Sequence, residues 1–539
     1  MSSRILLRGA LIADGIGVTT RRADLLIEGQ TIASIQDAAV PDGATAATNH
    51  PDTERTYREP TGDCEVIDLA PGSVVCPGFI DAHAHAEGPL LEYGRVDGAL
   101  AQGVTTLVVG QDGQSWIGAS AETVSYLNRY FGPVNGTAPG WLSERSGLSV
   151  AGYRAAVAGR LAQNVAVLAS QGTIRHNVAG LAARPLDEDE RKAAQRQVEG
   201  ALGEGAAGLS SGLDYLPSRF GGADEVAVLA RPLAAADRPY VSHLRGYGPN
   251  VGAGLAELIA VGATSGARVH ASHLWGPPAP ISAAFEAADE AGVTITFDAY
   301  PYRRSSTILA VLLLPPEVQA GGPDRTVAAL TDPAQHARLL AGEKFTHGYL
   351  QNLYLGCLPA TLAGFAGQSL TAAAASAGQP AGEWTLDLLA RTGLQVGAHL
   401  DRRSIAGEHL AWLAAHDRHC AGSDGIYQGQ HPHPRGFGAF ARLAGSYLPA
   451  TPPATGYQRL ARHLAANAAD VYGLRDRGRL APGLAADICV IAPGGLTERA
   501  TDEAPTAPAA GVDLVFVNGT VAWRDGAPAR GPRSGRVVS

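Results

Sequence analysis

Cysteine is scarce in this sequence, with five residues among 539. None of them shows the Cys-x-x-Cys spacing that is typical of redox motifs and of many zinc modules. The five positions are Cys64, Cys76, Cys357, Cys420 and Cys489. This scatter argues against a disulfide framework and against a cysteine-rich zinc module. We expect the cysteines to be small, buried hydrophobic side chains.

Long hydrophobic runs and an excess of positive charge are also missing. The formal net charge is -9, and no basic stripe indicates a nucleic-acid partner. The apolar runs are strand-sized or broken by glycine and proline, and the first residues lack the apolar core of a signal peptide. We therefore predict a cytoplasmic globular protein that acts on a small molecule, without nucleic-acid or membrane partners. A homo-oligomer stays open.

The two ends of the chain share a pattern of short strands and tight turns that the middle lacks. The segments with this pattern are 4–12, 23–33, 486–491 and 513–523. The simplest arrangement is one small β-sandwich domain, formed by about 1–75 together with 480–539. A stretch rich in threonine, proline and aspartate at about 37–63 is typical of a surface loop.

The middle of the chain alternates short apolar runs with helical stretches, as parallel sheets with crossover helices do. The candidate strands are 77–81, 104–109, 165–169, 206–210, 240–242, 268–272, 294–298 and 419–422. Eight strands, with no glycine-rich phosphate loop after the first, favour an α/β fold of the (β/α)8 TIM-barrel type over an open sheet. This catalytic barrel would span 76–479. The stretch at about 302–411 is too long for a crossover and predicts an inserted lid or subdomain.

The most informative segment is the apolar strand that leads into His83 and His85. Residues two apart in a strand point to the same face, so both imidazoles can reach one metal ion. Such a pair alone is a weak signal, because two histidines can equally be ordinary buried residues. Whether this pair is a metal site or two ordinary buried histidines depends on which other residues accompany it.

Further metal-ligand types follow the other predicted strands. Asp112 comes after the second strand, His243 after the fifth, His273 after the sixth and Asp424 after the eighth. Each alone is more often a core histidine or a turn-forming aspartate. Independent structural residues would not all fall at the carboxyl ends of strands, where barrel active sites lie. Together they predict a divalent-metal site and therefore an enzyme.

This arrangement resembles the amidohydrolase superfamily and, within it, the N-acyl-D-amino-acid deacylase (D-aminoacylase) family. The stretches that carry the resemblance are GVTTLVVG at 103–110, SHLR at 242–245, SHL at 272–274, DAYPY at 298–302, GSDG at 422–425 and HPRGFG at 433–438. The resemblance implies a zinc-dependent amidohydrolase that converts an N-acyl-D-amino acid to a carboxylate and a free D-amino acid. It implies one or two zinc ions per chain, held by His83, His85, Asp112, His243 and His273.

The resemblance also implies roles for residues that contact the substrate. Asp424 would accept the proton of the attacking water and pass it to the leaving amine. Tyr300 and Ser306 match positions near the substrate, although a packed aromatic ring and a helix-capping serine explain them equally well. Arg435 would bind the substrate carboxylate, against the alternative of a structural arginine.

Two positions depart from the family pattern. Asp112 stands where the family has a cysteine, so a carboxylate replaces a thiolate as a zinc-competent donor that can bridge two ions. Trp275 stands where a lysine near the substrate carboxylate is expected, which places more of the carboxylate recognition on Arg435. A bridging carboxylated lysine is excluded, because Lys192 and Lys344 lie in a polar helix and in the insertion.

Two other functions stay open from the sequence. A cyclic-amide hydrolase of the dihydropyrimidinase or hydantoinase type would share the barrel and the histidines, although it would use the missing lysine. A non-catalytic interaction protein on the same scaffold would be expected to have lost its ligands. For the deacylase, we predict a tighter metal at Asp112, His243 and His273, with His83 and His85 completing a second or weaker site.

Overall fold

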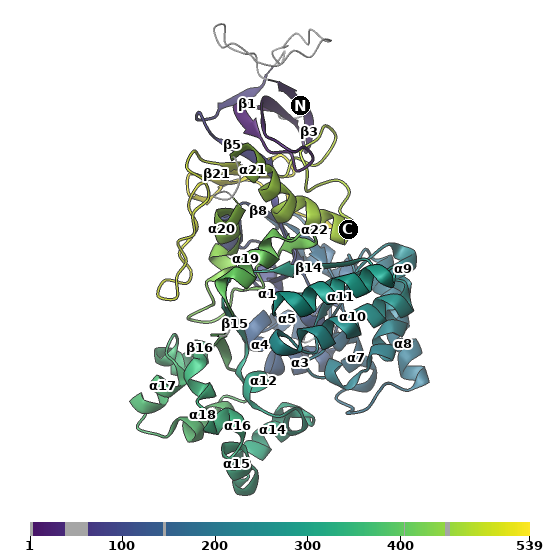
Figure 1. Ribbon diagram of the computed structural model, residues 1–539, viewed down its shortest axis with the longest axis vertical. Helices are drawn as coiled ribbons and strands as arrows, with labels where there is room; N and C mark the ends of the chain where they lie inside the picture. Colours follow the sequence, from purple (N-terminus) through teal and green to yellow (C-terminus); the bar gives the residue numbers. More distant parts are fainter. Residues whose placement is uncertain (1–3, 38–62, 144–146, 404, 448–452) are drawn as a thin grey trace.

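The computed structural model describes residues 4–37, 63–143, 147–403, 405–447 and 453–539. A sheet formed by both ends of the chain, a central barrel and a helical insertion follow one another along the long axis (Figure 1). Most of the predicted loop at 37–63 lies outside the described residues.

Eight parallel strands form the barrel, as the sequence predicts. They are β6 (Phe79–Asp81), β8 (Val104–Val109), β9 (Asn164–Val167), β11 (Leu209–Gly212), β12 (Tyr240–His243), β13 (Val269–Ala271), β14 (Ile295–Ala299) and β18 (His419–Ala421). Short strands extend three of them: β7 (Ala84–His85) after β6, β10 (Ala169–Ser170) after β9 and β19 (Gly425–Ile426) after β18. The barrel closes because β19 pairs with β7 and the Ala82 N–H donates to the Ala421 carbonyl at 3.0 Å.

Burial on both faces explains the composition of the barrel strands. All six residues of β8, in the order VTTLVV, are buried, as expected for a parallel strand covered on both sides. Gly78 lies just before β6, where a Cβ atom would approach Thr105 Cγ2 to 2.2 Å. Only glycine therefore allows the strand that carries the two histidines to lie this close to β8.

Helices surround the barrel and connect its strands. The α-helices before the insertion are α1 (Glu87–Glu92), α2 (Asp97–Leu100), α3 (Ala121–Tyr130), α4 (Gly132–Asn135), α5 (Gly140–Ser143), α6 (Val150–Val157), α7 (Gln171–Ala179), α8 (Glu188–Gly203), α9 (Ala223–Ala236), α10 (Val251–Ser265) and α11 (Pro278–Glu290). Short 3-10 turns are η1 (Gln111–Gly113), η2 (Ser218–Phe220) and η3 (Gly248–Asn250). After the insertion come α19 (Gly407–Ala415), α20 (Arg435–Tyr447), α21 (Pro453–Ala461), the π-helix η6 (Arg462–Ala466) and α22 (Asn467–Tyr472).

The acidic start of α8 illustrates how local sequence sets a helix boundary. The Asp187 carboxylate accepts a hydrogen bond from the Glu190 N–H at 2.9 Å, and the Glu190 carboxylate accepts one from the Asp187 N–H at 2.8 Å. This reciprocal capping box satisfies two N–H groups that the helix leaves unpaired.

Both ends of the chain contribute to one nine-stranded sheet. Its strands are, in order, β23 (Ala527–Pro528), β22 (Thr520–Arg524), β21 (Val512–Val517), β20 (Ile488–Ile491), β5 (Val74–Pro77), β1 (Arg4–Ile12), β2 (Arg21–Glu28) and β3 (Thr31–Asp37), with β4 (Glu65–Asp68) beside β1. The strand β24 (Val537–Val538) instead pairs with β9 of the barrel. The domain boundaries at 75 and 480 stay predictions.

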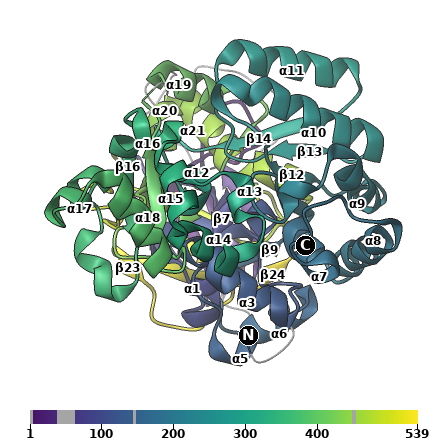
Figure 2. The ribbon, with the colours of Figure 1, turned by 90° about the horizontal axis from the view of Figure 1, so that it is seen from below.

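The insertion lies between β14 and β18 and has its own hydrophobic core around Trp384, Leu386 and Leu389. Its elements are β15 (Arg304–Ile308), α12 (Leu309–Leu313), α13 (Pro316–Gln319), α14 (Gly322–Thr331), α15 (Pro333–Leu340), α16 (Glu343–Thr346), η4 (Tyr349–Asn352), β16 (Leu353–Cys357), η5 (Ala360–Phe365), α17 (Leu370–Ser376), α18 (Ala381–Arg391) and β17 (Gly397–Asp401). Viewed from below, α12 to α15 lie in front of β7, across one end of the barrel (Figure 2).

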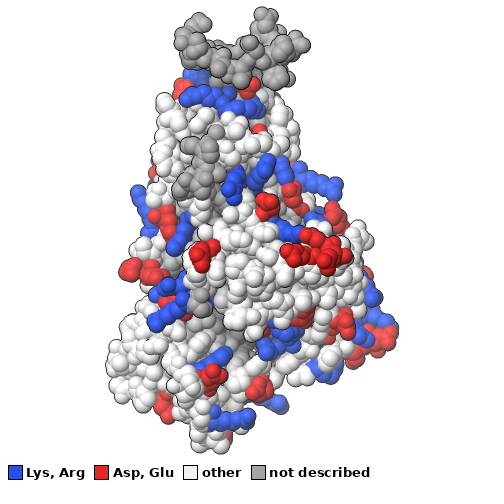
Figure 3. Space-filling model, viewed as in Figure 1, with Lys and Arg blue, Asp and Glu red and all other residues white. Residues whose placement is uncertain are grey.

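Acidic and basic side chains are interspersed on the face drawn in Figure 3. Cys76, Cys420 and Cys489 are buried as expected, whereas Cys64 and Cys357 are only partly buried. No helix among the described residues is both long and apolar enough to cross a membrane.

We predict that the buried ion pair between Arg175 and Glu225 stabilises this fold. The Arg175 Nη1 atom lies 2.6 Å from Glu225 Oε1, and the Leu186 N–H donates to Oε2 at 2.7 Å. Glu225→Ala leaves a buried guanidinium unpaired and should lower the free energy of unfolding by about 3–5 kcal/mol. Thermal unfolding of the variant measures this. Glu188→Ala, which removes an exposed pair with Lys192, should leave the melting temperature unchanged; equal shifts in the two variants would contradict the prediction.

Candidate metal centre and active site

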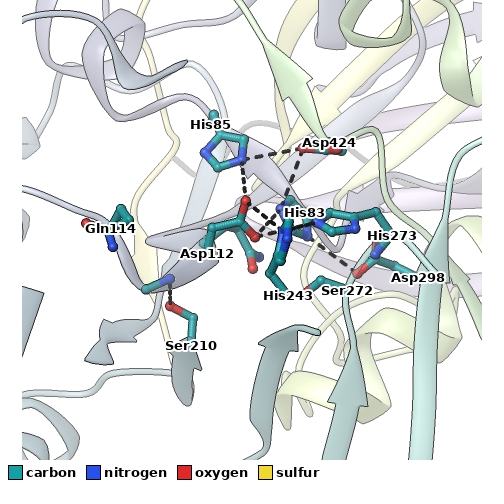
Figure 4. A network of polar contacts seen from close by, with 12 residues as sticks. His83, His85, Asp112, Gln114, Ser210, His243, Ser272, His273, Asp298 and Asp424 are labelled. Atoms are coloured by element: carbon teal, nitrogen blue, oxygen red, sulfur yellow. Dashed lines mark hydrogen bonds and ion pairs between the residues drawn. The ribbon is translucent and has the colours of Figure 1, made fainter. Parts of the chain in front are cut away.

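The predicted ligands and the predicted proton carrier converge at one end of the barrel (Figure 4). They come from the ends of five barrel strands, namely His83, His85, Asp112, His243, His273 and Asp424. All six side chains are buried or nearly so. The structure therefore brings together every residue that strand-end placement singled out.

Three of these residues have an unfavourable backbone conformation. Asp112, His273 and Asp424 have φ angles of 55°, 35° and 49°. Left-handed backbone is uncommon for residues other than glycine, although aspartate and histidine adopt it more often than most, so surrounding contacts must hold it. One such contact is the Asp424 N–H, which donates to the His83 carbonyl at 2.8 Å. Conformations of this kind concentrate at functional sites.

The donor atoms are spaced as ligands around a shared cation. His83 Nε2 lies 3.5 Å from Asp112 Oδ1, His273 Nε2 lies 3.6 Å from the same oxygen, and His85 Nε2 lies 3.4 Å from Asp424 Oδ1. These distances exceed a hydrogen bond. Two atoms at about 2.1 Å from a tetrahedral zinc ion would be about 3.4 Å apart. The residues therefore fit a zinc ion.

Unpartnered polar atoms support the same interpretation. Both ring nitrogens of His83 and the Oδ1 atom of Asp112 are buried without a hydrogen-bond partner. A buried polar atom without a partner costs free energy, and a cation ligated by these atoms would remove that cost. The donor set of imidazole and carboxylate suits zinc and similar divalent metals.

The ligands fall into two sets that overlap. One set is His83, His85 and Asp424, and the other is His83, Asp112 and His273, each with ligand atoms within 4.8 Å of one another. His243 lies next to two members of the second set. Its Nδ1 atom is 3.0 Å from His273 Nε2 and 3.6 Å from Asp112 Oδ2. That Asp112, His243 and His273 bind one metal more tightly than His83 and His85 bind another remains a prediction.

Asp298 contacts several residues of the cluster from behind. Its Oδ1 atom accepts a hydrogen bond from the His273 N–H at 2.9 Å, and its Oδ2 atom lies 3.1 Å from His270 Nε2 and 3.5 Å from His83 Nδ1. A carboxylate on the outer nitrogen of a ligating histidine fixes its tautomer and ring orientation. Asp298 therefore holds the backbone of His273 by a hydrogen bond and places a negative charge beside the His83 ring.

Asp214 and Asn135 lie beside the outer ring nitrogens of two further histidines. Asp214 Oδ2 lies 3.6 Å from His243 Nε2, on the side away from Asp112. Asn135 Oδ1 lies 3.1 Å from His85 Nδ1. Because the outer nitrogens are engaged, the inner nitrogens are left to face the cluster.

The carboxylates dominate the electrostatics of the cluster. Burial favours neutral imidazole, but Asp298, Asp112 and Asp424 outweigh it and raise the pKa of His83 to about 9. Burial is likewise outweighed at His243, where Asp112 and Asp214 raise the pKa to about 10. The site thus carries a surplus of negative charge that protons or a metal cation can balance.

Asp424 is held by an ion pair and by the turn that carries it. Its Oδ2 atom lies 2.7 Å from Nη1 of Arg435, whose side chain is fully buried. Burial raises the pKa of Asp424, but the guanidinium and the nearby histidines outweigh it, so the pKa is lowered. The preceding residue, Ser423, donates its N–H to Asp81 at 2.8 Å, which fixes the turn to β6. Asp424 is therefore an ionised, well-positioned carboxylate.

A cavity of about 1010 Å³ opens onto the cluster. Trp275, Tyr300 and Ser306 line it together with Asp424, whereas Arg435 does not. The outer wall comes from the insertion, where its apolar members include Leu312, Leu314 and Phe345. The insertion thus shapes the space in which a substrate would lie.

Sequence reasoning missed several residues of the site. Asp298 is the second-last residue of β14 and could have been found by the strand-end argument that found the histidines. Asp214 follows β11 in the same way. Arg402, which also lines the cavity, follows the last strand of the insertion and has no comparable signal in the sequence.

We predict that Asp298 supports metal binding without contacting the metal. Asp298→Asn keeps the size of the side chain but removes the negative charge beside His83 and His270. Metal affinity should fall by about 10- to 100-fold, the usual effect of losing an outer partner of a ligating histidine. Competition with a chelator measures the affinity. Asp289→Asn, which alters an exposed pair with Arg418, is the control, and an affinity equal to it would contradict this role.

Comparison with known proteins places the chain among deacylases. It is 31% identical over 544 residues to N-acyl-D-glutamate deacylase from Alcaligenes xylosoxydans xylosoxydans, covering 99% of this chain and 96% of that protein. D-aminoacylase from the same organism is 28% identical over 550 residues, covering 99% of this chain and 97% of that protein. No family model matches the chain.

Solved structures give the same result. A crystal structure of D-aminoacylase, described as defining a subset of amidohydrolases, superposes with a TM-score of 0.76 at 27% identity over 99% of both chains. N-acyl-D-glutamate deacylase from Bordetella bronchiseptica superposes with a TM-score of 0.78 at 27% identity over 99% of both chains. With the barrel, the ligand cluster and full-length similarity in agreement, the chain belongs to the D-aminoacylase family of amidohydrolases.

Proposed function

We propose that this protein is a zinc-dependent hydrolase that cleaves the amide bond of N-acyl-D-amino acids, releasing a carboxylate and a free D-amino acid. The observation that carries the proposal is the buried cluster of histidines and aspartates that opens onto the cavity beside Asp424. The similar Bordetella bronchiseptica deacylase structure contains zinc and a phosphonate inhibitor that mimics the tetrahedral intermediate.

The predicted ligands define which residues would hold the metal. They are His83, His85, Asp112, His243 and His273. A zinc ion held by them would lower the pKa of water towards about 7 and polarise the amide oxygen. Asp112 contributes a carboxylate whose oxygens lie near four of the histidines, as a bridging ligand requires. One or two ions per chain are compatible with the two overlapping sets.

Asp424 is the proton carrier in this proposal. It lies at the edge of the cavity, and one of its oxygens faces the histidines while the other faces Arg435. An ionised carboxylate in this position can accept a proton from the attacking water and return it to the leaving amine. Tyr300 and Ser306 line the same cavity and can donate hydrogen bonds to the substrate. We further propose a cytoplasmic location; the oligomeric state stays open.

The substrate class is tested with a panel of compounds. Zinc-loaded enzyme should hydrolyse N-acetyl-D-amino acids and discriminate against their L enantiomers, because relatives at this identity are named for D substrates. A five-substituted hydantoin tests the cyclic-amide alternative. Release of the free amino acid is measured by chromatography. Turnover of the hydantoin alone would overturn the deacylase assignment, and loss of zinc without loss of turnover would overturn the metal assignment.

A second prediction separates chemistry from metal binding at Asp424. Asp424→Asn should lower kcat by about 10²- to 10⁴-fold, the range that general acid–base catalysis supplies. Zinc content, measured by elemental analysis, should stay as in the wild type because the histidines and Asp112 remain. Near-normal turnover would refute the proton-carrier role, and loss of zinc would show that Asp424 acts mainly as a ligand.

A further inference from the structure

Apolar side chains of the insertion line the outer part of the cavity. They come from α12, α13, α16 and η4 and from the turn after α12. We call this part the apolar chamber, lined by Val311, Leu312, Leu314, Val318, Phe345 and Tyr349. All but Leu314 are only partly buried, so apolar surface faces the cavity. An apolar group of a ligand that covers this surface removes it from water and is bound more tightly for that reason.

The charged side chains that the insertion adds to the cavity lie at its rim. Glu317, Arg338 and Glu343 line the cavity and are exposed to solvent. The Lys344 ammonium donates to the Leu312 carbonyl, which links α16 to α12. Charged groups at a rim keep their hydration. An apolar ligand group can therefore fill the chamber without burying a charge.

The chamber begins next to the predicted metal ligands. The Tyr215 ring centre lies 4.8 Å from that of His243, and the Tyr215 hydroxyl lies 2.8 Å from Oγ1 of Thr307. Thr307 belongs to β15, the strand that leads directly into α12. The ion pair of Arg129 in α3 with Asp324 in α14, at 2.7 Å, also holds the insertion against the barrel. One aromatic ring thus separates the ligand cluster from the insertion.

The acyl end of a substrate points towards the chamber. In the proposed function, Asp424 returns a proton to the leaving nitrogen, so the nitrogen side of the amide lies next to Asp424. The acyl side then extends away from Asp424. Tyr215 lies beside His243, next to the set of ligands that does not contain Asp424. An acyl group that extends in this direction passes Tyr215 and enters the chamber.

The size of the cavity decides which acyl group fits. Pockets of about 300–1,000 Å³ enclose drug-sized ligands. This cavity has a volume of about 1010 Å³. An N-acetylamino acid is much smaller than a drug-sized ligand, and its side chain cannot exceed that of the largest amino acid. An acyl chain has no such limit, so a longer acyl group is the part of the substrate that can fill the remaining space.

We propose that the apolar chamber binds a medium- or long-chain aliphatic acyl group, and that N-fatty-acyl D-amino acids are the preferred substrates. This inference rests on the proposed function and narrows its substrate class. Hydrolysis adds one water across the amide bond, so the products are a fatty acid and the free D-amino acid.

The experiment compares N-acetyl-, N-butyryl-, N-hexanoyl- and N-octanoyl-D-leucine. For the wild type, kcat/KM should rise about two- to fourfold with each added methylene, because each methylene buries further apolar surface. Phe345→Ser should lower the ratio of the octanoyl to the acetyl value by about tenfold, because a small polar side chain replaces an apolar ring of the wall. That ratio does not depend on how much of the sample is folded.

Phe365→Ser is the matched control. Phe365 is also partly buried against the core of the insertion, but it does not line the cavity. Its octanoyl-to-acetyl ratio should stay within about twofold of the wild type. A second series, the N-acetyl derivatives of D-alanine, D-leucine and D-tryptophan, tests whether the chamber instead binds the amino-acid side chain.

A kcat/KM that stays level or falls from acetyl to octanoyl would overturn the inference. So would an octanoyl-to-acetyl ratio that is unchanged in Phe345→Ser, or one that falls equally in Phe345→Ser and Phe365→Ser. A Phe345→Ser enzyme with an altered side-chain series and an unaltered acyl series would assign the chamber to the side chain. A wild type that hydrolyses neither these D-leucine derivatives nor the corresponding D-glutamate derivatives would instead overturn the proposed function itself.

Discussion

The burial of several carboxylates beside histidines is the constraint on which the rest of this structure depends. Asp112, Asp298 and Asp424 are 3%, 0% and 5% exposed, and taking such charges out of water costs several kcal/mol per ion unless they are compensated. The parallel strands of the barrel bring their carboxyl ends together, which concentrates these charges in one place. Histidines, one buried arginine and the proposed metal balance them.

The compensation is arranged in layers with different tasks. Residues next to the cavity, such as His85 and Asp112, present donor atoms towards a common centre. Asp298 lies behind them, near His83, and Asp214, which also lines the cavity, lies on the side of His243 away from Asp112. Because the outer layer is itself buried or hydrogen bonded, the inner atoms have little freedom to reorganise, which is the state that catalysis through preorganised electrostatics requires.

Much of the barrel could be predicted because its strands are short apolar runs flanked by turns, and burial on both faces leaves few other interpretations for a run such as β8. The ligand residues followed from the same pattern, since the carboxyl end of a strand is a position that sequence alone defines.

The pairing of Arg435 with Asp424 could not be predicted, because the two are 11 positions apart in the chain and their contact depends on how the loop after β19 folds. Arg402 could not be predicted for a related reason, because its place at the cavity depends on how the insertion folds over the barrel. The internal fold of the insertion also escaped prediction, since its short helices pack on a separate core.

The two strands by which the insertion leaves and rejoins the barrel pair with one another, so that Arg304 lies opposite Asp401 and Ile308 opposite Gly397. Nearly a hundred residues thus begin and end side by side, as if they were a single long hairpin. Exchanging everything between these strands would leave the distance between the two attachment points the same and the core of the barrel untouched. Relatives with the same cluster of histidines and aspartates could therefore acquire new acyl or side-chain preferences by replacing this insertion as a unit. Such a change would not require a destabilised barrel as an intermediate.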